Sequence, residues 1–121
     1  MTISGPVIKG LGIGKKLGSP TINLDPVNAP KDLKHGVYVV TVKTPVGNFL
    51  GAMHYGPRPS IPNAPISLEV YCIGLNEDLY EKTVEIEVKK RLRDIKKFAN
   101  LEDLKKQIDK DIDIIRSHES S

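Results

Sequence analysis

Apolar and charged positions alternate most regularly near residue 84 of the chain. From Val84 to Val88, branched apolar residues take every second position with glutamates between them, which is typical of a strand with one buried face. Four other short apolar or β-branched stretches predict further strands, at residues 3–8, 37–42, 49–53 and 66–73. Pro6 lies inside the first of these, so that strand is expected at a sheet edge or a bulge. Residues 55–65 contain five prolines or glycines and predict a loop.

The last part of the chain follows a helical pattern. Five apolar residues form one stripe with spacings of three, four, four and three: Leu101, Leu104, Ile108, Ile112 and Ile115. Asn100 can cap this helix, and Glu102 and Asp103 put negative charge in its first turn. Strands followed by one helix predict an all-β fold with a C-terminal helix, as a small antiparallel barrel or sandwich. Residues 117–121 are expected to form a disordered tail.

The bulk properties describe an ordinary globular protein. A length of 121 residues supports one domain, residues 1–121. No apolar run is long enough to span a bilayer, no signal peptide is visible, and Cys72 is the sole cysteine. A cytoplasmic protein without a membrane partner is therefore expected. The net charge of +3 suits a phosphorylated small molecule and gives little support for a nucleic-acid partner.

Residues 14–24 (Gly-Lys-Lys-Leu-Gly-Ser-Pro-Thr-Ile-Asn-Leu) carry the first candidate site. Glycines let the backbone fold closely around a ligand, and lysines suit a polyanion. Pro20 stiffens the chain at this point, and in an extended segment Thr21 and Asn23 point to the same side. Their oxygens suit Mg²⁺, so the segment is interpreted as a nucleotide–magnesium site. The alternative is an ordinary turn, because Gly and Pro cluster in turns and neither a Walker A loop nor G-x-G-x-x-G is present.

Glu69 is the second candidate. It lies in a mostly apolar strand pattern, and a carboxylate withdrawn from water is often paired with a cation or kept as a general base. The alternative is that Glu69 lies on the solvent side of its strand, with Ser67 and Tyr71 on the same face. The basic run at residues 89–93 is more often a solvated surface, although one arginine just before the helix can turn inward.

Taken in order along nearly the whole chain, several motifs resemble the ATP-dependent riboflavin kinase (flavokinase) family. They lie at residues 7–10, 14–23 with the Pro-Thr-x-Asn block, 36–38, 56–60, 68–70, 78–80 and 93–98. The resemblance implies a six-stranded antiparallel Greek-key β-barrel with a C-terminal helix. It also implies an enzyme that transfers the γ-phosphoryl group of ATP to the 5′-hydroxyl of riboflavin, giving FMN and ADP.

The resemblance further implies roles for individual residues. Glu69 would be the catalytic base, and Thr21 and Asn23 would bind Mg²⁺, or another divalent metal, together with the ATP phosphates. The nucleotide site would also include Gly10, Lys15, Gly18, Pro20 and Tyr80. The flavin-side flap would contain Arg93, Lys96 and Phe98, while the other basic residues of the run, Lys89, Lys90 and Arg91, would mostly face solvent.

The sequence departs from the family pattern at a few positions: Ser19, Ile22, His54, Ser60 and Glu81. His54, for example, stands where bacterial members commonly carry Asn. None of these removes Glu69 or its proposed partners, so the departures bear on flavin affinity and flap dynamics more than on catalysis. Many bacterial members carry an adenylyltransferase domain in front of the kinase domain, and nothing precedes it here, so the chain is expected to stop at FMN.

Two other classes of function compete with the enzyme. A non-catalytic flavin- or nucleotide-binding barrel would explain the altered loops, but the retained Glu69 argues against it. A barrel that binds single-stranded nucleic acid would want exposed aromatic residues among basic ones, and the chain has six aromatic residues and no Trp. The expected partners are therefore riboflavin, FMN, ATP and ADP, without nucleic acid, and the chain is expected to be a monomer.

Overall fold

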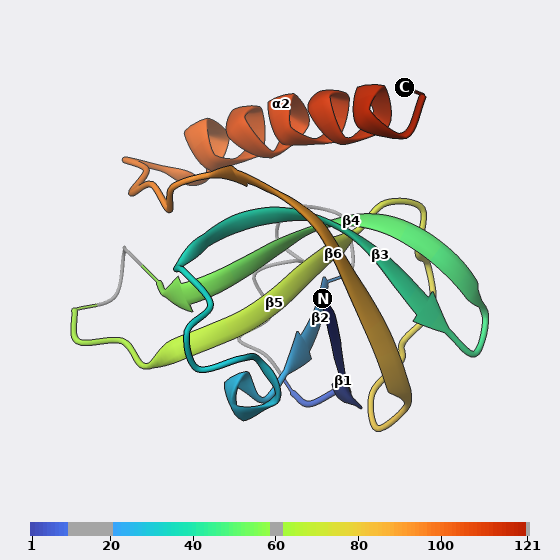
Figure 1. Cartoon of the computed structure of the whole chain (residues 1–121). Helices are drawn as coiled ribbons and strands as arrows, with labels where there is room; N and C mark the ends of the chain where they lie inside the picture. Colours follow the sequence, from blue (N-terminus) through green and yellow to red (C-terminus); the bar gives the residue numbers. More distant parts are fainter. Residues whose placement is uncertain (10–20, 59–61, 121) are drawn as a thin grey trace.

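Six antiparallel strands form one strongly curved sheet in the computed structural model of the chain (Figure 1). The structure describes residues 1–9, 21–58 and 62–120. Its strands are β1 (Thr2–Pro6), β2 (Thr21–Leu24), β3 (Gly36–Thr44), β4 (Gly47–Pro57), β5 (Ile66–Cys72) and β6 (Thr83–Arg93). The short 3₁₀ helix η1 (Pro26–Asn28) follows β2, and the long helix α2 (Leu101–Ser120) follows β6.

The strand order is that of a Greek key closed toward a barrel. The strands lie in the order β1-β6-β3-β4-β5-β2, so β6 returns beside the first of three consecutive strands. The two ends of the sheet also meet, because the N–H of Ile8 donates to the carbonyl of Asn23 across 2.7 Å. The predicted fold class, a six-stranded antiparallel Greek-key barrel with a C-terminal helix, is confirmed.

Alternation along the strands separates the barrel interior from an outer face. In β5, Leu68 and Val70 join the core, and in β2 Ile22 and Leu24 do the same. The residues between them are half-buried on the outer face, and Glu69 is one of these. Period-two alternation therefore collects the polar residues of the two candidate sites on one side of the sheet.

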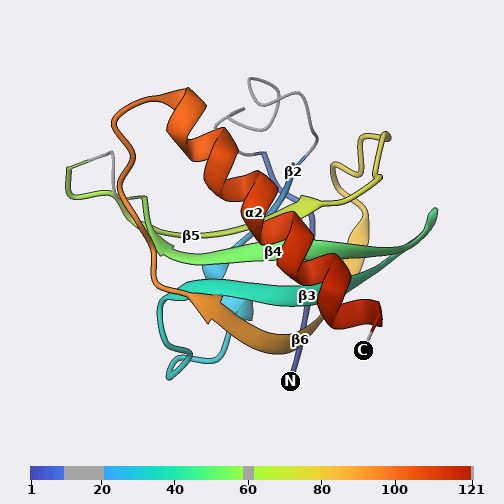
Figure 2. The same cartoon turned by 90° about the horizontal axis from the view of Figure 1, so that it is seen from above.

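Helix α2 lies across this outer face, over β4 and β3 (Figure 2). Its N-terminus is capped as expected, with the N–H of Asp103 donating to Oδ1 of Asn100 across 2.8 Å. Ile115, near the C-terminal end of the apolar stripe, is fully buried, whereas Leu101 at the other end is 48% exposed. The helix thus packs closely at one end, and the other end of the stripe is left to line a pocket.

Strand β4 extends further along the chain than the sequence pattern indicates, and the segment after Pro20 is a strand. The strand predicted at 49–53 is the longer β4, which runs through Pro57, so the loop prediction for residues 55–65 is wrong for its first three residues. Pro57 is tolerated because it occupies the last position of the strand, where it pairs with Ile66. The extended conformation considered for the residues after Pro20 is found, as β2.

The C-terminal elements are also longer than expected. Strand β6 includes the basic run at residues 89–93 in addition to the alternating stretch that starts at Val84. Helix α2 continues through Ser120, so residues 117–120 are helical and not a disordered tail. Adding a polar turn to an established helix costs little, because the nucleation cost is already met. No helix within the described ranges is both long and apolar enough to cross a membrane.

Candidate active site

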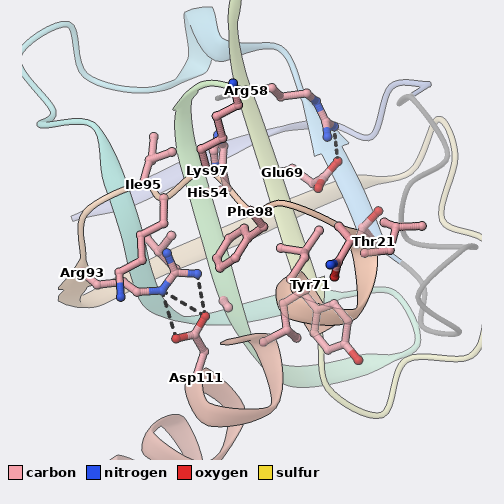
Figure 3. A pocket seen from close by; sticks show the side chains of 17 residues that line it. Thr21, His54, Arg58, Glu69, Tyr71, Arg93, Ile95, Lys97, Phe98 and Asp111 are labelled. Atoms are coloured by element: carbon pink, nitrogen blue, oxygen red, sulfur yellow. Dashed lines mark hydrogen bonds and ion pairs between the residues drawn. The ribbon is translucent and has the colours of Figure 1, made fainter. Parts of the chain in front are cut away.

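A pocket of about 350 Å³ lies between the outer face of the sheet and the underside of α2 (Figure 3). Its third side is the segment of residues 94–100 between β6 and α2, which we call the flap. The strands, together with the residue that follows β4, supply most of the polar lining: Thr21, His54, Arg58, Glu69, Tyr71 and Arg93. The flap and α2 supply most of the apolar lining: Ile95, Phe98, Leu101, Leu104 and Ile108.

The strand register sets several candidate side chains in one row across the outer face. Asn23 of β2 lies opposite Glu69 of β5, and Glu69 lies opposite His54 of β4. Val37 of β3 then lies opposite His54 on one side and Arg93 on the other. Directly opposed residues have Cβ atoms about 4.5–5.5 Å apart in antiparallel sheets. The register therefore makes neighbours of residues that are distant in the sequence.

Glu69 occupies the centre of the polar part of the pocket. It lies on the outer face with Ser67 and Tyr71, as the solvent-side alternative holds, but flap and helix cover that face and its side chain is only 16% exposed. Nη2 of Arg58 lies 2.5 Å from Oε2 of Glu69, and the Arg58 side chain is 13% exposed. Sequence reasoning assigned Arg58 no role, although it lies in the motif at residues 56–60.

His54 is a neutral neighbour of Glu69. Its Nε2 lies 3.1 Å from the carbonyl oxygen of Gly56, and because a carbonyl oxygen only accepts, this contact requires the proton on Nε2. Burial lowers the pKa of His54, although the Gly56 hydrogen bond and the Glu69 charge oppose that shift. The imidazole is therefore uncharged at neutral pH and offers Nδ1 as an acceptor.

Thr21 and Asn23 take the positions that the metal interpretation requires. Both are half-buried on the outer face of β2, two residues apart. Asn23 lies opposite Glu69, and Thr21 lies opposite Tyr71 and lines the pocket. In the part of the chain that the structure describes, neither of these two side chains is engaged in a hydrogen bond. The hydroxyl and amide oxygens are hard donors of the kind that Mg²⁺ prefers.

The remaining predicted nucleotide residues are not part of the described pocket. Gly10, Lys15, Gly18 and Pro20 lie outside the described residues. Tyr80 is 45% exposed in the connection between β5 and β6, where its N–H donates to Oδ1 of Asp78 across 2.9 Å, and it does not line the pocket. Its assignment to the nucleotide side therefore stays a prediction.

Arg93 lines the pocket, but its guanidinium is already engaged. Nη2 lies 2.8 Å from Oδ2 of Asp111, and Nε lies 3.1 and 3.2 Å from the two carboxylate oxygens. Asp111 is 2% exposed and also accepts from Nε2 of Gln107 across 3.0 Å. Nη1 of Arg93 donates to the carbonyl of Asp94. Arg93 thus ties the end of β6 to the middle of α2, and its flavin-binding role stays a prediction.

The flap is seated on the barrel by several contacts. Ile95 packs against Gly56, where an added Cβ would lie 2.5 Å from Cδ1 of Ile95 at a backbone φ of 144°. The Arg91 guanidinium holds Asp94 across 2.6 Å and keeps the pKa of that carboxyl low. Phe98 points into the middle of the pocket (Figure 3).

The basic run behaves largely as expected. Lys89 and Lys90 are exposed, and Lys96 lines the pocket from an exposed position in the flap. Arg91 differs from the expectation, because it is half-buried and donates to the carbonyl of His35 as well as to the flap.

Comparison with known proteins identifies the family. The family model described as "Flavokinase: Riboflavin kinase" matches residues 1–118. The chain belongs to the riboflavin kinase family. The RNA-binding riboflavin kinase RibR of Bacillus subtilis is 35% identical over 114 residues, which cover 93% of this chain and 49% of that protein. A bifunctional riboflavin kinase/FMN adenylyltransferase of Buchnera aphidicola is 37% identical, covering 97% of this chain and 38% of the relative.

Two solved structures are similar in fold to this chain. A crystal structure described as a macrolide-efflux protein from Streptococcus pneumoniae has a TM-score of 0.79 and 28% identity, over 95% of this chain and 38% of that one. Riboflavin kinase from Trypanosoma brucei has a TM-score of 0.66 and 23% identity, over 97% and 78% of the two chains. The chain spans about half or less of the length of the two curated relatives. Because the Bacillus relative is named for RNA binding, the expected lack of a nucleic-acid partner stays a prediction.

Proposed function

We propose that the chain is a riboflavin kinase, which transfers the γ-phosphoryl group of ATP to the 5′-hydroxyl of riboflavin and releases FMN and ADP. The observation that carries the proposal is that Glu69 and Thr21 line one pocket, to which the flap and α2 add a group of apolar side chains. Phosphoryl transfer to an alcohol needs a positioned phosphate, a cation and a group that orients the hydroxyl. Membership of the riboflavin kinase family supports the same reaction.

The apolar part of the pocket suits the flavin ring. Phe98, Leu104 and Ile108 line this space from the flap and from α2. Flat aromatic rings bind by burying their faces against such side chains, with a few polar groups fixing their orientation. A ring bound there directs the ribityl chain toward Glu69, and the flap and helix keep bulk water from the reacting hydroxyl.

Glu69 then acts as the general base. Its carboxylate receives the hydroxyl proton as the hydroxyl oxygen forms a bond to the γ-phosphorus. The bond from that phosphorus to the β–γ bridging oxygen breaks, and ADP leaves with the electron pair. Because phosphoryl transfer has a loose transition state in most analyses, orienting the hydroxyl contributes alongside removing its proton.

Thr21 and Asn23 would hold the metal. When bound with ATP, Mg²⁺ or another divalent ion supplies positive charge that neutralises the phosphates. Thr21→Ala is expected to lose metal-dependent turnover, and Asn23→Asp to impair the use of ATP because it adds a negative charge beside the phosphates. If both variants kept full activity across a Mg²⁺ titration, the metal assignment would be wrong.

One incubation tests the activity. The protein is mixed with riboflavin, ATP and Mg²⁺, and FMN is separated by chromatography, where FAD would also be resolved. Bound riboflavin without any FMN would assign the chain to the non-catalytic flavin-binding class. An FAD peak would show a second activity in addition to the proposed one.

Glu69→Gln tests the base. The variant keeps shape and hydrogen bonding but cannot receive the proton, so kcat should fall by about 10²–10⁴-fold with riboflavin and ATP binding near wild type. Glu85→Gln, at an exposed position of β6, is the matched control. A loss confined to KM would make Glu69 a binding residue, and an unchanged kcat would remove its role.

The proposed setting of this activity is a cytoplasmic monomer with small-molecule partners. The mild net charge of +3 is consistent with that setting. Light scattering coupled to gel filtration measures the oligomeric state. A salt-dependent change in the elution volume of the protein on mixing with RNA would contradict the proposed absence of a nucleic-acid partner.

A further inference from the structure

Arg58 is the strongest charged neighbour of the proposed base, and neither the metal site nor the proton transfer uses it. It directly follows β4, whose register places Gly56 opposite Ser67 and His54 opposite Glu69. From there its side chain reaches back over the outer face, and its guanidinium points at Glu69 in Figure 3. Both side chains line the pocket and are at least five-sixths withdrawn from solvent.

Stability alone does not account for this ion pair. Withdrawing two charges from water costs about as much as their mutual attraction returns, so partly buried pairs contribute little net stability. Both partners, moreover, lie on the pocket side of the sheet and outside the apolar barrel core. The reason for the pair is better sought in what it does to the Glu69 carboxylate.

The hydrogen bonds around Glu69 show what fixes that carboxylate. Arg58 donates to Oε2, and no second hydrogen bond to Glu69 occurs among the residues that the structure describes. His54 lies directly opposite Glu69, yet its Nε2 is engaged with the carbonyl of Gly56. Since a glutamate side chain has three rotatable bonds, Arg58 is, among the described residues, the contact that selects its orientation, and it engages Oε2 and not Oε1.

We propose that Arg58 is a positioning residue for the phosphoryl transfer, which holds Glu69 through Oε2 so that Oε1 meets the substrate hydroxyl. The inference rests on the proposed riboflavin kinase activity. Arginine keeps its proton throughout, so the proton of the hydroxyl passes to Oε1 of Glu69 and afterwards to water. A general base must lie within hydrogen-bond reach of the proton it removes, and a misplacement of about 1 Å can cost about 10²-fold in rate.

A double-mutant cycle between Arg58 and Glu69 tests this role. Initial rates are measured with ATP labelled at the γ-phosphate, which detects slow variants, and riboflavin affinity is measured by fluorescence quenching. Arg58→Ala should lower kcat by about 10–100-fold while the riboflavin KM changes by less than about threefold. In the Glu69→Gln background the same replacement should change kcat by less than about twofold, because the group that it positions no longer acts as a base.

Further measurements distinguish the charge of Arg58 from its planar hydrogen-bonding group. Arg58→Lys retains the charge without the planar fork, so its kcat should lie between those of wild type and Arg58→Ala. Guanidinium ion added at millimolar concentration should restore part of the kcat of Arg58→Ala and none in the double variant. Lys90→Ala, at an exposed position of β6, is the control for loss of a cationic side chain and should keep wild-type kcat.

The outcomes separate the two proposals. An equal fold-loss in both Glu69 backgrounds means that Arg58 acts on the phosphates or on the scaffold, and it overturns the positioning role. If Arg58→Ala does not fold, as judged by its melting curve, the same cycle is run with Arg58→Lys and read in the same way. A wild-type protein that makes no FMN overturns the proposed function, and this inference with it.

Discussion

The ion pair between Arg93 and Asp111 anchors helix α2, which covers the pocket, to the end of strand β6. Asp111 is 2% exposed and receives N–H groups from Arg93 and Gln107, and the Arg93 side chain is 16% exposed. Asp111→Asn keeps the shape of the side chain but removes its charge. The variant therefore leaves the largely buried guanidinium of Arg93 without its counter-charge, and this guanidinium is the group that anchors α2.

The structure sets the size of the expected loss. Removing one partner of a buried ion pair costs about 3–5 kcal/mol. The loss here should be smaller, about 2–3 kcal/mol, because an asparagine oxygen still accepts one N–H and Arg93 keeps its bond to the carbonyl of Asp94. For a domain of this size about 1 kcal/mol corresponds to a shift in Tm of about 4 °C, so Tm should fall by about 8–12 °C.

Thermal unfolding followed by circular dichroism measures this shift. Asp113→Asn, on an exposed position of the same helix, is the matched control and should stay within about 0.5 kcal/mol of wild type. Riboflavin should also bind more weakly to Asp111→Asn, since helix α2, which lines the pocket, is less firmly anchored to the sheet. A variant that melts within about 2 °C of wild type would refute the anchoring role.

Three further outcomes concern His54, Gly56 and Cys72. Burial lowers the pKa of His54 below its ordinary 6.5, so just below pH 6.5 the unfolded chain binds a proton that the folded chain does not. The wild-type protein should therefore lose stability relative to His54→Asn as the pH falls below about 6.5. Parallel plots of Tm against pH for the two proteins would contradict this. Gly56→Ala should displace Ile95 and weaken riboflavin binding in a fluorescence titration, whereas an unchanged Kd would show that the flap does not need that contact. Burial raises the pKa of the Cys72 thiol to about 12, so a disulfide reagent at pH 8 should react only after denaturant is added, and rapid labelling of the native protein would disprove this.

Local patterns predicted much of the fold and the centre of the site. An extended segment after Pro20 would put Thr21 and Asn23 on one side, and the structure has them so in β2. The alternative interpretation of Glu69 put it on the outer face with Ser67 and Tyr71, and that placement also agrees with the structure. What such patterns cannot give is the register between strands. That register brings Glu69 between Asn23 and His54.

Partners that depend on tertiary packing were missed for the same reason. Arg58 meets Glu69 because β4 continues through Gly56 and Pro57, the glycine and proline that indicated a loop. Asp111 left a signal in the sequence, since it follows Ile108 by three residues and precedes Ile115 by four, inside the apolar stripe of the helix. A lone carboxylate in such a stripe indicates a buried cation partner, but only the packed helix identifies that partner as Arg93.

The backbone bridge between Ile8 and Asn23 has a consequence for how the proposed metal site can be altered. Asn23 accepts the N–H of Ile8 on its carbonyl oxygen, and on the other edge of β2 it pairs with Glu69 of β5. Both contacts use main-chain atoms, so they do not depend on which side chain stands at position 23. A substitution there therefore changes the oxygen offered to a metal ion while the strand that carries it keeps its place.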